Sequence, residues 1–386
     1  MSRFPSGEAA CRLPDMDGVL TRGVVIVGLV GLLFGVSGAC GKSNGTRPLG
    51  PNDVSVLFPM AASEALWPAT MPARGGVLLP AGELARVGLS IVREVEEAGE
   101  HAALRVVAAR FDPCFREALD GPCQPQIRLV FQVPDPAGGF FDGAVHALYA
   151  LLPADWTAVV TELERLAGVA PENGDAVLGV SPALRAQGMD GPYARGLRAL
   201  VAAHAGEGNL VRVTFVTRTH ARAGQWQMGG VVVGGGKLPI AGVDATQQNV
   251  TRNLTERFEY VVMPLFAERV GRIGASASAL DRLEPAARAQ IHAWAVRQQD
   301  PAQHLPDTTD CASCHLSAHV APHLEALDPT LATPTLVASR GLRARGAADA
   351  EPDNLRAFGW FGKEPVVAQR TANETRAVLR ALDAAR

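Results

Sequence analysis

The sequence predicts an α+β fold, because apolar residues recur with two different periods in neighbouring segments. At 127–133 and 211–215 they alternate with polar residues, which is typical of half-buried strands. At 156–166 and 197–204 they recur every three or four positions, which is typical of amphipathic helices. The last third of the chain shows mainly the helical period. We therefore expect a mixed α+β body followed by a mainly helical segment.

Three local signals place further elements. A pair of glycines at 229–230 interrupts an apolar run, so we expect the strand there to bend or to bulge. A stripe of apolar residues at helical spacing covers 280–294. Thr371-Ala-Asn-Glu374 has the spacing of a capping box, in which the Thr and Glu side chains each accept a bond from a backbone N–H. It predicts a final helix that opens at this point.

An uncharged apolar run at 23–41 follows Arg22 and contains small residues just before Cys40. This is the pattern of a secretory signal peptide. The end of the run resembles the lipobox of bacterial lipoproteins, in which the cysteine becomes residue one after cleavage and is lipidated. A start at Met16 instead of Met1 would give a conventional short n-region. An uncleaved membrane anchor is the alternative, because about twenty apolar residues are enough to span a bilayer.

These signals divide the chain into four segments. Residues 1–39 form the signal peptide, residues 40–53 a flexible tether, residues 54–275 the α+β body and residues 276–386 the helical segment. The net charge of −3 at pH 7 argues against a nucleic-acid surface. Gly-x-Ser-x-Gly and His-Glu-x-x-His do not occur in the sequence, which argues weakly against a hydrolase.

Two cysteines in the body lie close together in the sequence. Cys114 and Cys123 each follow a proline, so both sit at bends that can face each other across a short loop. In an oxidising compartment they should form a disulfide, which agrees with export. On the loop-entropy model a loop this short stabilises the fold by about 2.5–3 kcal/mol. A redox-active dithiol is the weaker alternative, because the spacing is not Cys-x-x-Cys.

Cys311-Ala-Ser-Cys314-His315 carries chemistry by itself, because Cys-x-x-Cys-His is the attachment motif of c-type haem. Two thiols at this spacing can form thioether bonds to the two haem vinyl groups. The histidine that follows is placed to become the proximal iron ligand. The sequence therefore predicts one covalent haem c, held by Cys311 and Cys314, with His315 on the iron.

Two other interpretations of this motif stay open. With His319 and His323, the two cysteines resemble a short zinc knuckle, although zinc needs reduced thiols. Alternatively, Cys311 and Cys314 form only a local disulfide, with His315 incidental.

The order of helix, haem motif, long loops and final helix over 276–386 is similar to small cytochrome c domains. Members of that family usually supply a methionine as second axial ligand downstream of the motif, but no methionine follows Met263. The second ligand would then come from an earlier residue, with His304, His292, Met263 and Met228 as candidates. Without one, the iron would be five-coordinate and open to a gas or to peroxide.

The whole sequence resembles uncharacterised bacterial lipoproteins, here with a C-terminal c-type cytochrome motif. The two resemblances imply a lipid anchor in the membrane, a covalent haem and an unidentified redox partner protein. One-electron transfer, more than enzymatic catalysis, is the expected role. Gly41 after the lipobox cysteine resembles lipoproteins of the outer membrane, so we expect a position there, facing the periplasm or the exterior. The alternative is a non-redox envelope protein for binding or scaffolding.

Overall fold

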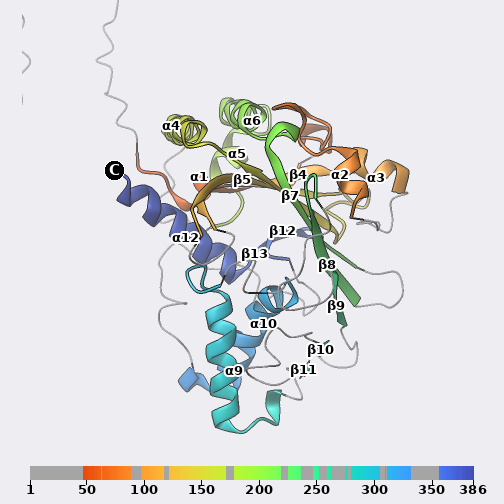
Figure 1. The fold of residues 1–386 in the computed structure, drawn as a ribbon, viewed down its shortest axis with the longest axis vertical. Helices are drawn as coiled ribbons and strands as arrows, with labels where there is room; N and C mark the ends of the chain where they lie inside the picture. Colours follow the sequence, from red (N-terminus) through yellow and green to blue (C-terminus); the bar gives the residue numbers. More distant parts are fainter. Residues whose placement is uncertain are drawn as a thin grey trace, which may run out of the picture. The chain divides into compact units, whose positions relative to one another are not determined.

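A seven-stranded antiparallel sheet forms the centre of the fold (Figure 1). Its strands lie in the order β1-β4-β5-β6-β7-β8-β9, so each strand from β4 onward pairs with the next sheet strand along the chain. The bounds are β1 (Ser55–Leu57), β4 (Arg105–Phe115), β5 (Gln124–Gln132), β6 (Ala144–Ala150), β7 (Leu210–Arg218), β8 (Gln225–Val232) and β9 (Gln247–Thr251).

The structure is a computed structural model, and it describes residues 47–61, 63–87, 97–116, 121–170, 178–218, 225–235, 247–251, 259–261, 274–276, 280–304, 309, 311–331 and 356–386. All of these belong to one compact unit, Gly45–Arg386. The expected signal peptide, Cys40 and Met263 lie outside the described residues. No helix in the described ranges combines the length and the apolar content needed to cross a membrane.

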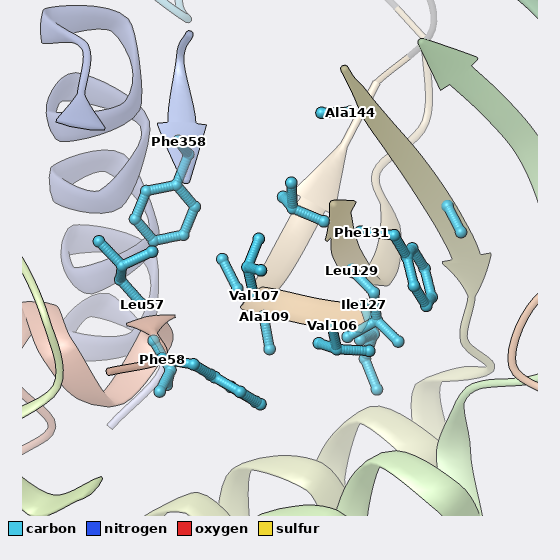
Figure 2. Close-up of a cluster of buried hydrophobic side chains, with 14 of the residues drawn as sticks. Leu57, Phe58, Val106, Val107, Ala109, Ile127, Leu129, Phe131, Ala144 and Phe358 are labelled. Carbon is cyan, nitrogen blue, oxygen red and sulfur yellow. The ribbon is translucent and has the colours of Figure 1, made fainter. Parts of the chain in front are cut away.

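Helices α4 (Pro153–Val169), α5 (Pro182–Gln187) and α6 (Pro192–His204) lie along one face of the sheet (Figure 1). Strand residues that point to this face are buried and form the main core: Phe111, Ile127, Leu129, Phe131, Val145, Ala147, Tyr149, Val213 and Phe215. Figure 2 shows a cluster of buried apolar side chains that includes residues of β1, β4, β5, β6 and β12. Burial of this apolar area is the main force that holds the layers together.

The other face of the sheet carries the C-terminal elements. These are α9 (Pro285–Gln298), α10 (Cys311–Leu327), the hairpin of β12 (Phe358–Phe361) and β13 (Glu364–Val367), and α12 (Gln369–Ala384). The hairpin contacts β4 and β5, α12 contacts β4, and α10 contacts β8 and β9. The segment predicted to be mainly helical therefore also contributes a hairpin, and it packs directly on the body sheet.

The remaining elements are short. They are α1 (Pro51–Val54), η1 (Ser63–Ala65), β2 (Pro72–Ala73), β3 (Gly76–Val77), α2 (Ala81–Ala85), α3 (Glu97–Ala103), η2 (Glu207–Asn209), β10 (Glu259–Val261), β11 (Gly274–Ser276) and η3 (Pro329–Leu331). The mixed α+β class is confirmed, and so are the strands at 127–133 and 211–215 and the helices at 156–166 and 197–204.

We expected a bend or a bulge at residues 229–230, and the structure has no bulge there. β8 pairs with β7 in unbroken register through Phe215↔Gly229 and Thr214↔Gly230. The glycine at 230 is required for space instead, because a Cβ there would lie 2.6 Å from the Val213 carbonyl oxygen. The close approach of the β7 and β8 backbones explains why a glycine stands at position 230.

The capping box predicted at Thr371 is also wrong, because α12 already begins at Gln369. Thr371 lies inside the helix, and its hydroxyl donates to the Ala357 carbonyl over 3.0 Å. Glu374 points to the sheet, where it pairs with arginine side chains. Both side chains that the local pattern assigned to a helix cap bind partners from other elements instead.

The expected tether 40–53 is folded from Arg47 onward. The Arg47 guanidinium binds both carboxylate oxygens of Asp53, at 2.6 and 2.9 Å, and Asp53 is buried at the first turn of α1. Leu49 is buried in the core. The polar composition suggested a linker, but these polar groups satisfy one another, so the chain can pack here.

Candidate functional site

The Cys-x-x-Cys-His motif opens a helix. α10 begins at Cys311, so Cys311, Cys314 and His315 occupy its first two turns. Positions i, i+3 and i+4 share one side of a helix, and all three residues are half-buried. The local geometry therefore brings both thiols and the imidazole to the same side of one rigid element.

One of the two described cysteine pairs forms a disulfide. Cys114 and Cys123 form a disulfide with a Cα–Cα distance of 4.4 Å, which confirms the predicted pair. It joins the end of β4 to the residue before β5, across the loop of that hairpin. Cys311 and Cys314, among the cysteines that the structure describes, are not in a disulfide.

α9 and α10 pack along each other, and two histidines hold them in place. His292 Nε2 of α9 lies 2.8 Å from Glu325 Oε1 of α10. His323 Nε2 of α10 lies 2.9 Å from Asp281 Oδ1, just ahead of α9. His292 is a buried bracing residue, which makes it a poor second iron ligand. His323, which the zinc interpretation requires, has a carboxylate partner, and the side chain of His319 is outside the described atoms.

In the described ranges no group of three or more His, Cys, Asp and Glu side chains converges as metal ligands do. Of the other second-ligand candidates, Met228 is buried on β8, and it points to the sheet face that the C-terminal elements cover. His304 lies in the loop between α9 and α10, at intermediate burial.

A buried carboxylate from α12 pairs with three arginines. Glu374 binds Arg110 of β4, lies 2.7 Å from Arg370 one turn earlier, and lies 3.9 Å from Arg128 of β5. Arg110 also pairs with Asp112 at 3.2 Å. We call these five residues the arginine cluster. It lies between the sheet and α12, on the face that also carries α10.

The arginine cluster fixes the charge of Glu374. Burial alone would raise the pKa of this carboxyl group, but the positive charges of Arg110, Arg370 and Arg128 outweigh burial and hold its pKa well below the usual range. Arg128 Nε is buried and has no hydrogen-bond partner in the described part of the chain. A cationic N–H is therefore left in this region to bind an anionic group.

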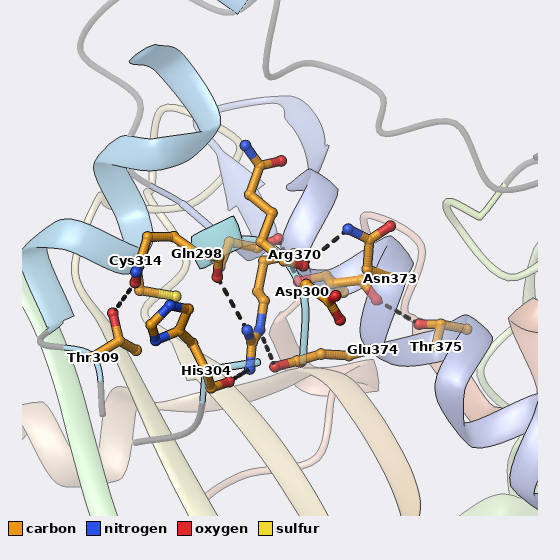
Figure 3. Close-up of polar contacts among 12 residues, drawn as sticks. Gln298, Asp300, His304, Thr309, Cys314, Arg370, Asn373, Glu374 and Thr375 are labelled. Carbon is orange, nitrogen blue, oxygen red and sulfur yellow. Dashed lines mark hydrogen bonds and ion pairs between the residues drawn. The ribbon is translucent and has the colours of Figure 1, made fainter. Parts of the chain in front are cut away.

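α12 also holds the loop that leads to the Cys-x-x-Cys-His motif, as Figure 3 shows. Arg370 donates to the Gln298 carbonyl over 3.0 Å and to the His304 carbonyl over 2.7 Å. Asn373 Nδ2 donates to the Gln299 carbonyl over 2.9 Å, and Gln299 Nε2 donates to the Ser317 carbonyl of α10 over 3.0 Å. One side of α12 thus fixes both the loop and α10.

The sheet contributes a histidine that the sequence analysis did not single out. His146 lies on β6, and its Nδ1 is 3.3 Å from the Thr214 hydroxyl of β7. Burial lowers the pKa of His146 to about 3, with smaller contributions from the charges of Arg128, His315 and Arg356. The His315 imidazole of α10 therefore lies near His146. The available sequence signal was a titratable residue within an otherwise apolar strand.

The residues present fit a covalent haem. Two thiols and an imidazole on one side of a helix are the donor set that haem c uses. The buried, unpartnered Nε of Arg128 suits a propionate carboxylate. Comparison with family models, with curated proteins and with solved structures gives no match.

Proposed function

We propose that this protein is a membrane-anchored extracytoplasmic lipoprotein that binds one covalent haem c through Cys311 and Cys314 and transfers single electrons. The observation that carries the proposal is the start of α10 at Cys311, which places both thiols and His315 on one side of a helix. The C-terminal segment then acts as a cytochrome c-like unit built onto the body sheet.

Each residue of the motif has a defined role. Each thiol adds its S–H across one vinyl group, which forms a carbon–sulfur bond and places the hydrogen on the neighbouring carbon. This addition consumes no oxidant and needs both thiols reduced. His315 supplies a ring nitrogen to the iron. When bound, the haem supplies a one-electron couple.

The surrounding protein would keep this unit rigid. The bonds from Arg370 and Asn373 to the 298–304 loop limit the movement of α10 relative to the sheet. A rigid site lowers the cost of reorganisation when the charge on the iron changes. The three arginines of the arginine cluster exceed its two carboxylates by one positive charge, which would favour a propionate nearby.

Export supports the same function. The Cys114–Cys123 disulfide is the kind that persists in oxidising compartments, where haem c is also attached. A signal peptide over 1–39 and lipidation at Cys40 would hold the protein at the outer membrane, facing the periplasm or the exterior. An envelope redox protein is the partner that this position implies.

The test is covalent haem content. The chain, expressed with a cytochrome c maturation system, should retain haem through denaturing electrophoresis. Cys311→Ala and Cys314→Ala should weaken or abolish that retention, whereas Ser317→Ala, on the same helix, should not. Denatured protein without haem would overturn the proposal. Metal analysis under reducing conditions would then separate a zinc site from a local disulfide in a non-redox envelope protein.

A further inference from the structure

His146 faces the C-terminal elements rather than the main core. β6 pairs it with Val130 of β5 and with Thr214 of β7, and the shift in the β6–β7 register comes only after Leu148. Its neighbours Val145 and Ala147 are fully buried on the opposite face. Side chains alternate along a strand, so the imidazole of His146 projects from the face that carries α10 and α12.

This position lies close to α10. Thr214, beside His146, is paired with Gly230 of β8, so no side chain stands at that next position of the sheet face. α10 packs against β8 and β9. The charge of His315 is one of the smaller causes that lower the pKa of His146, after burial and the charge of Arg128. Strand register places His146 on the sheet face that carries α10, and the effect of the His315 charge agrees with that placement.

The local environment of His146 suits a metal ligand. Its side chain has intermediate exposure on the sheet face that carries the C-terminal elements. The Thr214 hydroxyl contacts Nδ1 at 3.3 Å, and contacts of this kind fix the orientation of ligating histidines. The other ring nitrogen, Nε2, is on the far side of the ring from that contact. Imidazole is a common axial ligand of haem iron.

We propose that His146 of β6 is the second axial ligand of the haem, so that the iron is held between the sheet and α10. This inference rests on the proposed attachment of haem through Cys311 and Cys314. It adds a fifth candidate to the four expected from the sequence, of which His292 is unsuitable because it braces α9 against α10. The body domain would then supply one half of the site, and the C-terminal segment the other half.

The test compares matched variants of the full-length holoprotein by optical and electron paramagnetic resonance spectroscopy. The wild type should be low-spin in both oxidation states, with two nitrogen ligands. His146→Ala should retain covalent haem but convert to a high-spin form, and added imidazole should restore the low-spin spectrum. His146→Met should introduce a methionine–iron charge-transfer band and raise the reduction potential.

Two controls make the outcomes distinct. His204→Met, on α6 across the sheet, should leave the spectrum unchanged, and His304→Met tests the loop histidine. A charge-transfer band from His304→Met but not from His146→Met would overturn the inference in favour of His304. A wild-type spectrum that His146→Ala leaves unchanged would also overturn it, while covalent haem in that variant keeps the proposed function intact. Absence of covalent haem from the wild type would defeat the proposed function itself.

Discussion

Arg370 and Glu374 lie one turn apart on α12 and form an ion pair of 2.7 Å, yet each also binds a different part of the molecule. Glu374 reaches Arg110 in β4, and Arg370 reaches the backbone of the loop before the haem motif. The pair therefore couples the sheet to the loop through a single helical turn. Substitution of Glu374 tests the contact with the sheet, and substitution of Arg370 tests the contact with the loop.

Glu374→Gln should remove the negative charge that three arginines share. Breaking a buried ion pair from one side typically costs about 3–5 kcal/mol. Because the pKa of Glu374 is lowered in the folded state, its contribution is present above the pKa of the unfolded carboxyl, about 4.5, and is lost as the pH falls further. Denaturant unfolding from pH 7 to pH 3 should show a smaller pH dependence in the variant.

The matched control for this prediction is Glu162→Gln. Glu162 pairs with Arg165 at 2.6 Å, but that arginine is more than half exposed. Exposed pairs contribute at most about 1 kcal/mol. Equal losses of stability in the two variants would contradict a special role for the arginine cluster.

Arg370→Met should loosen the loop before the haem motif while α12 stays folded. The substitution keeps an unbranched side chain of similar length but removes the donors to the Gln298 and His304 carbonyls. Amide hydrogen exchange over 299–304 should then become faster. Arg386→Met, whose arginine makes an exposed pair with Glu164, serves as the control. Unchanged exchange over 299–304 in Arg370→Met would show that the loop is held by other contacts.

The Cys114–Cys123 disulfide should be recovered as one cross-linked peptide when the protein is digested without reduction. Replacing both cysteines by serine should lower the free energy of unfolding by about 2.5–3 kcal/mol on the loop-entropy model. Alkylation of both as free thiols in protein from the cell envelope would argue against an oxidising compartment.

Gly230→Ala should destabilise the sheet, because the new Cβ would lie 2.6 Å from the Val213 carbonyl oxygen. Overpacking of this kind typically costs about 1–3 kcal/mol. Gly235→Ala is the control, since its Cβ would meet Val232 at an ordinary 3.5 Å. Thermal unfolding of the two variants measures the difference, and comparable melting temperatures would remove the close-approach explanation.

Cys40→Ala should leave the protein without a lipid and release it from the membrane fraction. The expectation follows from the apolar run that leads to Cys40 and from the lipobox pattern at its end. Membrane fractionation measures the outcome. Variant and wild type bound equally to the membrane would favour an uncleaved apolar anchor.

The sequence was most informative where a local pattern decides the structure. β5 and β7 follow from alternation, because one face of each strand is buried in the main core. The Cys114–Cys123 bridge follows from spacing, since both cysteines flank one hairpin loop. α10 begins at the motif because its residues share a helical turn.

The sequence was least informative where the interactions of a side chain depend on a residue far away in the sequence. Thr371 and Glu374 match a capping box, but their partners, Ala357 and Arg110, come from other elements. His146 carries no motif, and its significance depends on a sheet face and a helix that lie far apart in sequence. Pairings of this kind appear only once the tertiary fold is known.

A hydrogen bond between Ser55 and Thr375 spans 320 positions of the chain, at 2.8 Å and fully buried. Contacts between residues this far apart in the sequence tend to form late in folding, because the intervening chain must first lose conformational freedom. We therefore expect α12 to dock after the sheet has formed. The α10 thiols would then pass through a period in which they are accessible to an attachment enzyme, and docking of α12 would end that period.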